Sequence, residues 1–140
     1  MTFTLIIGSN GRVDVGEVTA DHMVEGVTSV DMPNSWKTKE TKFLQDTATR
    51  TIMIERAWSV TLNFAKDSTD SAGQVVLRTA YAAGSNVCIK IYEDYTNAPT
   101  KFYTCATAVV PDFSVKVDPN NEVANTCTIK SNGVAMTLPV

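Results

Sequence analysis

The sequence has few of the residues that bind metals or act as acids and bases near neutral pH. Its 140 residues include one histidine, His22, and three cysteines with no CxxC pair. A structural zinc site needs a matched set of four ligands, so we expect neither a metal site nor a cofactor. We interpret Cys88, Cys105 and Cys127 as buried thiols on separate strands, made in a reducing compartment.

The sequence also lacks an excess of positive charge and any long apolar run. Twelve basic residues against 15 acidic ones give a formal net charge of −3. This balance argues against tight nucleic-acid binding, which needs a basic surface to neutralise phosphates. Leu5-Ile6-Ile7, the longest apolar run near the N-terminus, follows no basic region and falls far short of the roughly 20 residues of a membrane span. We expect neither a signal peptide nor membrane insertion.

No catalytic motif is recognisable. The sequence contains no G-x-S-x-G element, no phosphate-binding glycine motif and no partner set for His22. The adjacent carboxylates Glu93 and Asp94 would point to opposite faces of a strand, which does not suit paired acid–base chemistry. We therefore expect no catalytic residues and no enzyme activity.

The dominant pattern is an alternation with period two. Even positions from 52 to 64 are apolar except for Arg56, and shorter alternating runs occur around residues 3–7, 87–91 and 113–117. Turn signals such as Asn10-Gly11 and Asn132-Gly133 separate these runs. The spacing predicts an all-β sandwich or barrel of about seven to eight strands, as a single domain over residues 1–140.

One segment has helical spacing instead. Its apolar residues form one stripe, which predicts a helix over 71–83 that flanks the β core. Ser71 and Gln74 have the spacing of a capping box, and Gly84 is suited to ending the helix. The stripe consists of Gly73, Val76, Leu77, Ala80 and Tyr81.

Residues 33–48 fit neither pattern and predict a long polar loop. Trp36, Phe43 and Leu44 are too apolar for a purely solvated loop, so we expect it to contact another subunit. Residues 1–35 carry one basic and five acidic side chains, whereas residues 36–66 carry six basic and three acidic ones. Unlike patches on one small body suit a head-to-tail contact between identical copies.

The order of these features resembles the tail tube (major tail) proteins of tailed bacteriophages. The resemblance runs from about Gly26 to Val140: a strand ending in Val27-Thr28-Ser29-Val30, the polar loop, the long strand over 50–64, the helix, and the paired strands after Gly84. The match lies in pattern and element order, because this family carries no catalytic signature.

The resemblance implies a structural virion protein. Its subunits would form hexameric rings that stack head to tail into a hollow tail tube through which DNA passes into the host. The polar loop would then contact neighbouring subunits through Trp36, Lys37, Lys39, Lys42, Phe43 and Leu44. Polar residues of the long strand would suit the wall of the bore: Glu55, Ser59, Thr61 and Asn63.

The partners implied are further copies of the chain and other tail proteins: a tail tip or baseplate, a terminator and possibly a sheath. Double-stranded DNA would pass without specific binding. The tail would be assembled in the host bacterial cytoplasm and found in the virion. Six subunits with about four strands each, spaced about 4.8 Å apart, would enclose a bore of roughly 37 Å, wide enough for a duplex.

Two other classes remain open at this point. A tube or terminator protein of a secretion or bacteriocin injection machine would share these features. A small-ligand β-barrel of the lipocalin type would need an interior cavity and a stable monomer, and the long charged loop fits it poorly.

Overall fold

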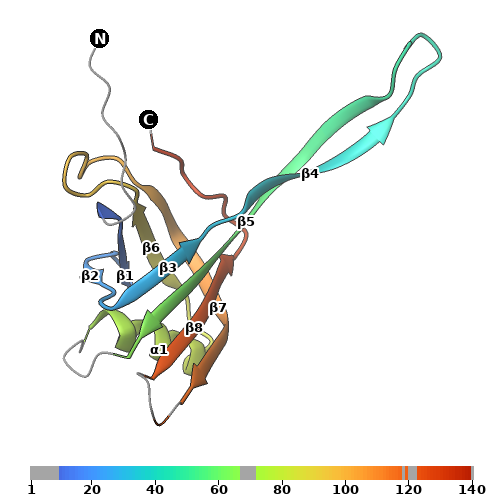
Figure 1. Cartoon of the computed structure of the whole chain (residues 1–140). Coiled ribbons are helices and arrows are strands. Elements are labelled where there is room, and N and C mark those ends of the chain that lie inside the picture. Colours follow the sequence, from blue (N-terminus) through green and yellow to red (C-terminus); the bar gives the residue numbers. More distant parts are fainter. Residues whose placement is uncertain (1–9, 67–71, 118, 120–122, 140) are drawn as a thin grey trace.

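In the computed structural model, described over residues 10–66, 72–117, 119 and 123–139, the chain is mostly β with one helix. The predicted fold class is confirmed. The elements are β1 (Arg12–Gly16), β2 (His22–Met23), β3 (Val27–Asp31), β4 (Asn34–Thr41), β5 (Arg50–Ala65), α1 (Gly73–Ala83), β6 (Val87–Tyr92), β7 (Tyr103–Lys116) and β8 (Ala124–Ser131) (Figure 1).

The strands form one antiparallel sheet in the order β2-β1-β6-β7-β8-β5-β3, and β4 pairs with β5 outside this path. The 16-residue strand β5 pairs with different strands along its two halves. Its first half pairs with β4, and its second half pairs with β3 on one side and β8 on the other. One long strand therefore connects a projecting hairpin to the body.

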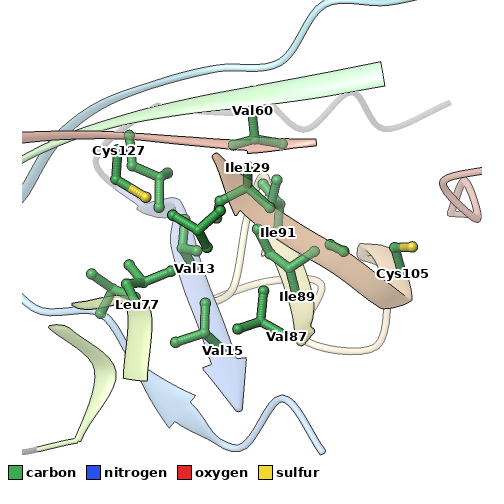
Figure 2. Close-up of a cluster of buried hydrophobic side chains, with 14 of the residues drawn as sticks. Val13, Val15, Val60, Leu77, Val87, Ile89, Ile91, Cys105, Cys127 and Ile129 are labelled. Carbon is green, nitrogen blue, oxygen red and sulfur yellow. The ribbon is translucent and has the colours of Figure 1, made fainter. Parts of the chain in front are cut away.

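The core lies between the two halves of this order, with β1 and β6 on one side and β8 and β5 on the other. Figure 2 shows Val13 and Val15 of β1 and Ile89 of β6 gathered with Val60 of β5 and Ile129 of β8. Leu77 of α1 closes the cluster from the helix side and is fully buried. Alternation along each strand produces this core, because every second side chain points to the same face.

Helix α1 confirms the predicted C-terminal end and corrects the predicted cap. Gly84 follows the last turn with φ of 65°, the left-handed conformation that glycine adopts without strain. At the other end Ala72 is the N-cap and provides no side-chain cap, while Ser71 lies outside the described residues. Gln74 is buried and its Nε2 donates to the backbone oxygens of Glu25 and Ala65, at 2.8 and 2.9 Å, so it joins the helix to the sheet.

The region predicted as a long polar loop is more regular than its composition suggests. Residues 34–41 form β4, and only residues 42–49 connect it to β5. Figure 1 shows the resulting hairpin projecting away from the body. We call residues 34–57 the arm. Its strands are exposed almost throughout, because no other strand or helix among the described residues packs on them.

Candidate assembly surfaces

The arm carries a concentration of exposed apolar side chains. Leu44 at the tip is fully exposed, and five further large apolar side chains of the arm are between 42% and 56% exposed. Monomeric proteins rarely expose so many large apolar side chains on one short element, so their concentration on the arm points to an interaction site. The five are Trp36, Phe43, Ile52, Met53 and Ile54.

Because of a β-bulge in the arm, side chains at even positions of β5 do not all lie on the same face, although the sequence pattern predicted that they would. Lys37 pairs with Glu55 and the next residue, Thr38, pairs with Met53, so Ile54 is the extra residue on β5. Beyond the bulge the alternation shifts by one position. Ile52 and Trp58 therefore lie on opposite faces of β5, although both are at even positions. The continuous apolar face expected over 52–64 exists only in the buried second half.

The tip of the arm is held by its own contacts. Asp46 accepts a hydrogen bond from the backbone N–H of Phe43 at 3.1 Å, and its other oxygen pairs with Arg50 at 2.7 Å. The Arg50 guanidinium also packs over the Phe43 ring, 4.9 Å from its centre. These contacts order the turn and leave Leu44 pointing into solvent.

A second surface is the outer face of four strands, β3, β5, β8 and β7. Ser59, Thr61 and Asn63 of β5 lie on this face, opposite the buried residues that alternate with them. The neighbouring strands add small polar side chains in register with Thr61 and Asn63: Asp31 and Ser29 of β3, Thr128 and Thr126 of β8, and Asp112 and Ser114 of β7. We call this surface the polar face.

Hydrogen bonds join the strands across the polar face. Asn63 donates through Nδ2 to Ser29 Oγ at 2.7 Å and accepts through Oδ1 from Thr126 at 2.8 Å. The amide orientation is thereby fixed, because each of its two ends meets a partner of the matching kind. The result is a surface of hydroxyl, amide and carboxylate groups, to which Lys130 of β8 and Lys116 of β7 add two exposed ammonium groups.

The four strands of the polar face end in two edges that no other described strand covers. β3 is the last strand of the order and pairs only with β5. The second half of β7, from Asp112 to Lys116, pairs with β8, while β6 pairs only with the first half. Uncovered edges offer unpaired backbone groups and tend to associate with other strands.

A cleft of about 790 Å³ opens on the other side of β3, where the ends of the strand order approach each other. Its apolar lining includes Met23 and Val30, which are 40% and 39% exposed. Glu25 and Glu93 also line it, and Glu93 accepts a hydrogen bond from Tyr103.

The cysteines are free and buried, as the sequence predicted. Burial raises the pKa of the Cys127 thiol to about 12, so this group stays protonated and unreactive at neutral pH. Burial also raises the pKa of Cys88. Among the described residues no cluster of three metal-binding side chains occurs, and none of the helical structure there is long and apolar enough to cross a bilayer.

The structure distributes the residues singled out from sequence over these surfaces. Trp36, Lys37 and Lys39 lie on β4, and the other three interface candidates, Lys42, Phe43 and Leu44, lie in the turn at the tip. Ser59, Thr61 and Asn63 come together on the polar face. Glu55 points to the same side of β5 but lies on the arm, with Oε1 3.9 Å from Lys37 Nζ.

Sequence reasoning missed the cleft and most of the polar face. The sequence did contain a pattern that indicates the polar face, since Thr126 and Thr128 alternate with Cys127 and Ile129, which are buried. The cleft had no such signal, because its lining comes from five separate strands and from the connections between them.

Comparison with known proteins gives a consistent result at the level of structure. No protein-family model and no curated protein sequence matches this chain. Among solved structures, the tail of an empty gene transfer agent particle with C6 symmetry has a TM-score of 0.75 at 11% identity, covering 96% of this chain and 98% of that one. The SPP1 tail tube has a TM-score of 0.76 at 12% identity, covering 97% of this chain and 81% of that one.

A component of an injection machine is also similar. The sheath/tube terminator of an extracellular contractile injection system, PVC, has a TM-score of 0.64 at 14% identity, covering 98% of this chain and 99% of that one. Identities this low, spread over nearly whole chains, establish the architecture alone. The chain has the fold found in tail tubes and in the terminators of contractile injection systems.

Proposed function

We propose that this protein is the structural subunit of a tail tube, and that hexameric rings of it stack head to tail into a hollow tube. The observation that carries this proposal is the polar face bounded by two uncovered edges. β3 runs antiparallel to β5, β5 to β8 and β8 to β7. A β3 strand from a second copy would therefore meet β7 in antiparallel orientation, and the pattern would continue from copy to copy.

Repeating this contact in a ring would cover both edges of every subunit. Closure is the one arrangement that removes β-sheet edges altogether. With the six-fold symmetry of the similar gene transfer agent tail, four strands per subunit give 24 strands and a bore of roughly 37 Å at about 4.8 Å per strand. The polar face would line this bore, with Ser59, Thr61 and Asn63 toward the duplex.

The chemistry of the polar face suits the passage of DNA. It presents hydroxyl and amide groups with two carboxylates, Asp31 and Asp112, and two exposed lysines, Lys116 and Lys130, so its formal charges balance. A duplex would pass a wall that lacks the net positive charge with which DNA-binding proteins hold phosphates. Glu55 would lie where the bore meets the next ring, since it sits on the arm.

The remaining parts of the chain complete this proposal. Residues 1–140 would act as one tube-forming unit, with 33–48 as the contact between subunits. A structural role of this kind requires no catalytic residue. The partners would be other copies, a tip or baseplate, a terminator and, in a contractile tail, a sheath. The site of assembly would be the host cytoplasm and the final location the virion.

The test is negative-stain electron microscopy of the purified chain over a concentration series. We expect hollow rings or tubes whose amount rises with concentration. Compact monomers at every concentration, also after addition of preformed tail tips as nuclei, would contradict the proposal. Rings that never stack would instead favour a terminator, the alternative that the similarity to the PVC protein supports.

A further inference from the structure

The cleft beside β3 has the chemistry of a receptor for the arm. Its apolar side chains Met23 and Val30 are about 40% exposed, although they face inward from the sheet edge. A volume of about 790 Å³ lies within the ~300–1,000 Å³ range of pockets that enclose bound groups. The cleft is therefore large enough to admit the side chains of a hairpin tip.

The charge of the cleft is acidic. Glu25 and Glu93 line it. The cation in the lining, Arg12, is neutralised within the chain, because its Nε lies 2.7 Å from Asp14 and its guanidinium packs over the Tyr95 ring. The cleft thus combines apolar walls with two carboxylates.

The arm is complementary to the cleft in its apolar character and in its charge. Its tip presents the fully exposed Leu44 with Phe43 beside it. Lys39 and Lys42 flank this apolar tip, and neither forms an ion pair with another described residue, whereas Arg50 is paired with Asp46. The arm holds five of the 12 basic residues of the chain and three of the 15 acidic ones, so the rest of the chain carries seven basic and twelve acidic residues.

The arm cannot insert into the cleft of its own chain. Met32, which lines the cleft, lies two residues before the start of the arm, and the eight residues of β4 then carry the tip about 26 Å farther at roughly 3.3 Å per residue. Figure 1 shows that this direction leads away from the body. The occupant must come from another molecule.

We propose that the arm tip of one copy, Phe43 and Leu44 with Lys39 and Lys42, docks into the cleft lined by Met23, Val30, Glu25 and Glu93 of a second copy. This inference rests on the proposed function and names the receiving surface on the neighbouring subunit. The apolar pair fills the cleft and the lysines meet its carboxylates.

The test is cross-linking between two single-cysteine variants. Native cysteines are buried, so a cysteine replacing Leu44 and one replacing Val30 are the reactive thiols. We expect a short bismaleimide to join L44C to V30C, and L44C to M23C, in mixed samples. The matched control is V75C on α1, because Val75 is 41% exposed but lies outside the cleft. At least a ten-fold lower yield with V75C is expected.

The outcomes separate this inference from the proposed function. Tubes that form without an L44C–V30C product, or with equal yield for V75C, overturn the docking site and leave the tube in place. A cross-linked product without rings or tubes supports docking and contradicts the tube. Cross-linking within a single L44C/V30C chain, or a co-purifying small molecule that native mass spectrometry finds in uncross-linked monomers, assigns the cleft to another occupant.

Discussion

Gln74 illustrates how a single residue can reverse an expectation drawn from local spacing. As a surface residue it would complete a capping box, but its side chain is buried and donates to the connection between β2 and β3 at Glu25 and to the end of β5 at Ala65. A buried donor left without its acceptor costs about 1–3 kcal/mol, so tertiary bonds outweigh a local cap. The start of α1 is therefore fixed by the sheet below it.

The neighbouring Gly73 leads to a prediction at the same scale. Alanine usually stabilises a helix relative to glycine by roughly 1 kcal/mol. Here a Cβ at Gly73 would lie 2.2 Å from the backbone oxygen of Met23 and 2.8 Å from Cα of Val24. Because these are backbone atoms, the helix must move. We expect Gly73→Ala to destabilise the monomer by about 1–3 kcal/mol in urea unfolding.

Thr79→Ala on the exposed side of α1 is the matched control for Gly73→Ala. It changes helix propensity without a clash, and we expect it to be neutral or stabilising by a few tenths of a kcal/mol. If Gly73→Ala were as stable as Thr79→Ala, the close packing of the helix start on β2 would be wrong.

At the scale of elements, the arm is the part whose conformation the sequence predicted least well. Period two identified the body strands because each has one buried face. β4 has no buried face, so Asn34–Thr41 carries no alternation to detect. The arm's apolar residues Trp36, Phe43 and Leu44 are exposed, and their contact with another subunit stays a prediction. The bulge at Ile54 was hidden as well, because it arises from pairing with β4 and not from composition.

The arm also carries a prediction about assembly. Changing Lys37, Lys39 and Lys42 to glutamate should abolish tubes in negative stain while leaving urea unfolding within about 1 kcal/mol of the parent, since all three side chains are exposed. The charge of the arm would then repel the acidic body of its neighbour. Trp36→Ala should reduce tube formation through lost apolar contact.

The control for the glutamate variant keeps the charge. Changing the same three lysines to arginine preserves the sign of the arm and should leave tube formation intact. Normal tubes from the glutamate variant would remove these lysines from the subunit contact.

At the scale of the whole molecule, the orientation of the polar face in a tube is the main expectation. Thr61 belongs to this face, whereas Val75 on α1 lies on the other side of the sheet. We predict that attaching a 5-kDa polyethylene glycol to T61C before assembly blocks tube formation, because six chains per ring cannot share a bore of roughly 37 Å. The same label on V75C should be tolerated.

Assembly after labelling is scored by sedimentation and negative stain. Unlabelled T61C must form tubes for the comparison to hold, and the change from threonine to cysteine is small. Normal tubes from labelled T61C would show that the polar face is turned outward and that another surface lines the bore.

The bulged, two-stranded form of the arm has a mechanical consequence for such a tube. Ribbons of two strands twist and bend more readily than wide sheets, and the bulge at Ile54 supplies a point of flexure within the ribbon. In a stack joined by arms, curvature would concentrate in the gaps between rings while each closed ring kept its shape. The tube would then bend at the contacts between rings, and the bore within each ring would keep its width.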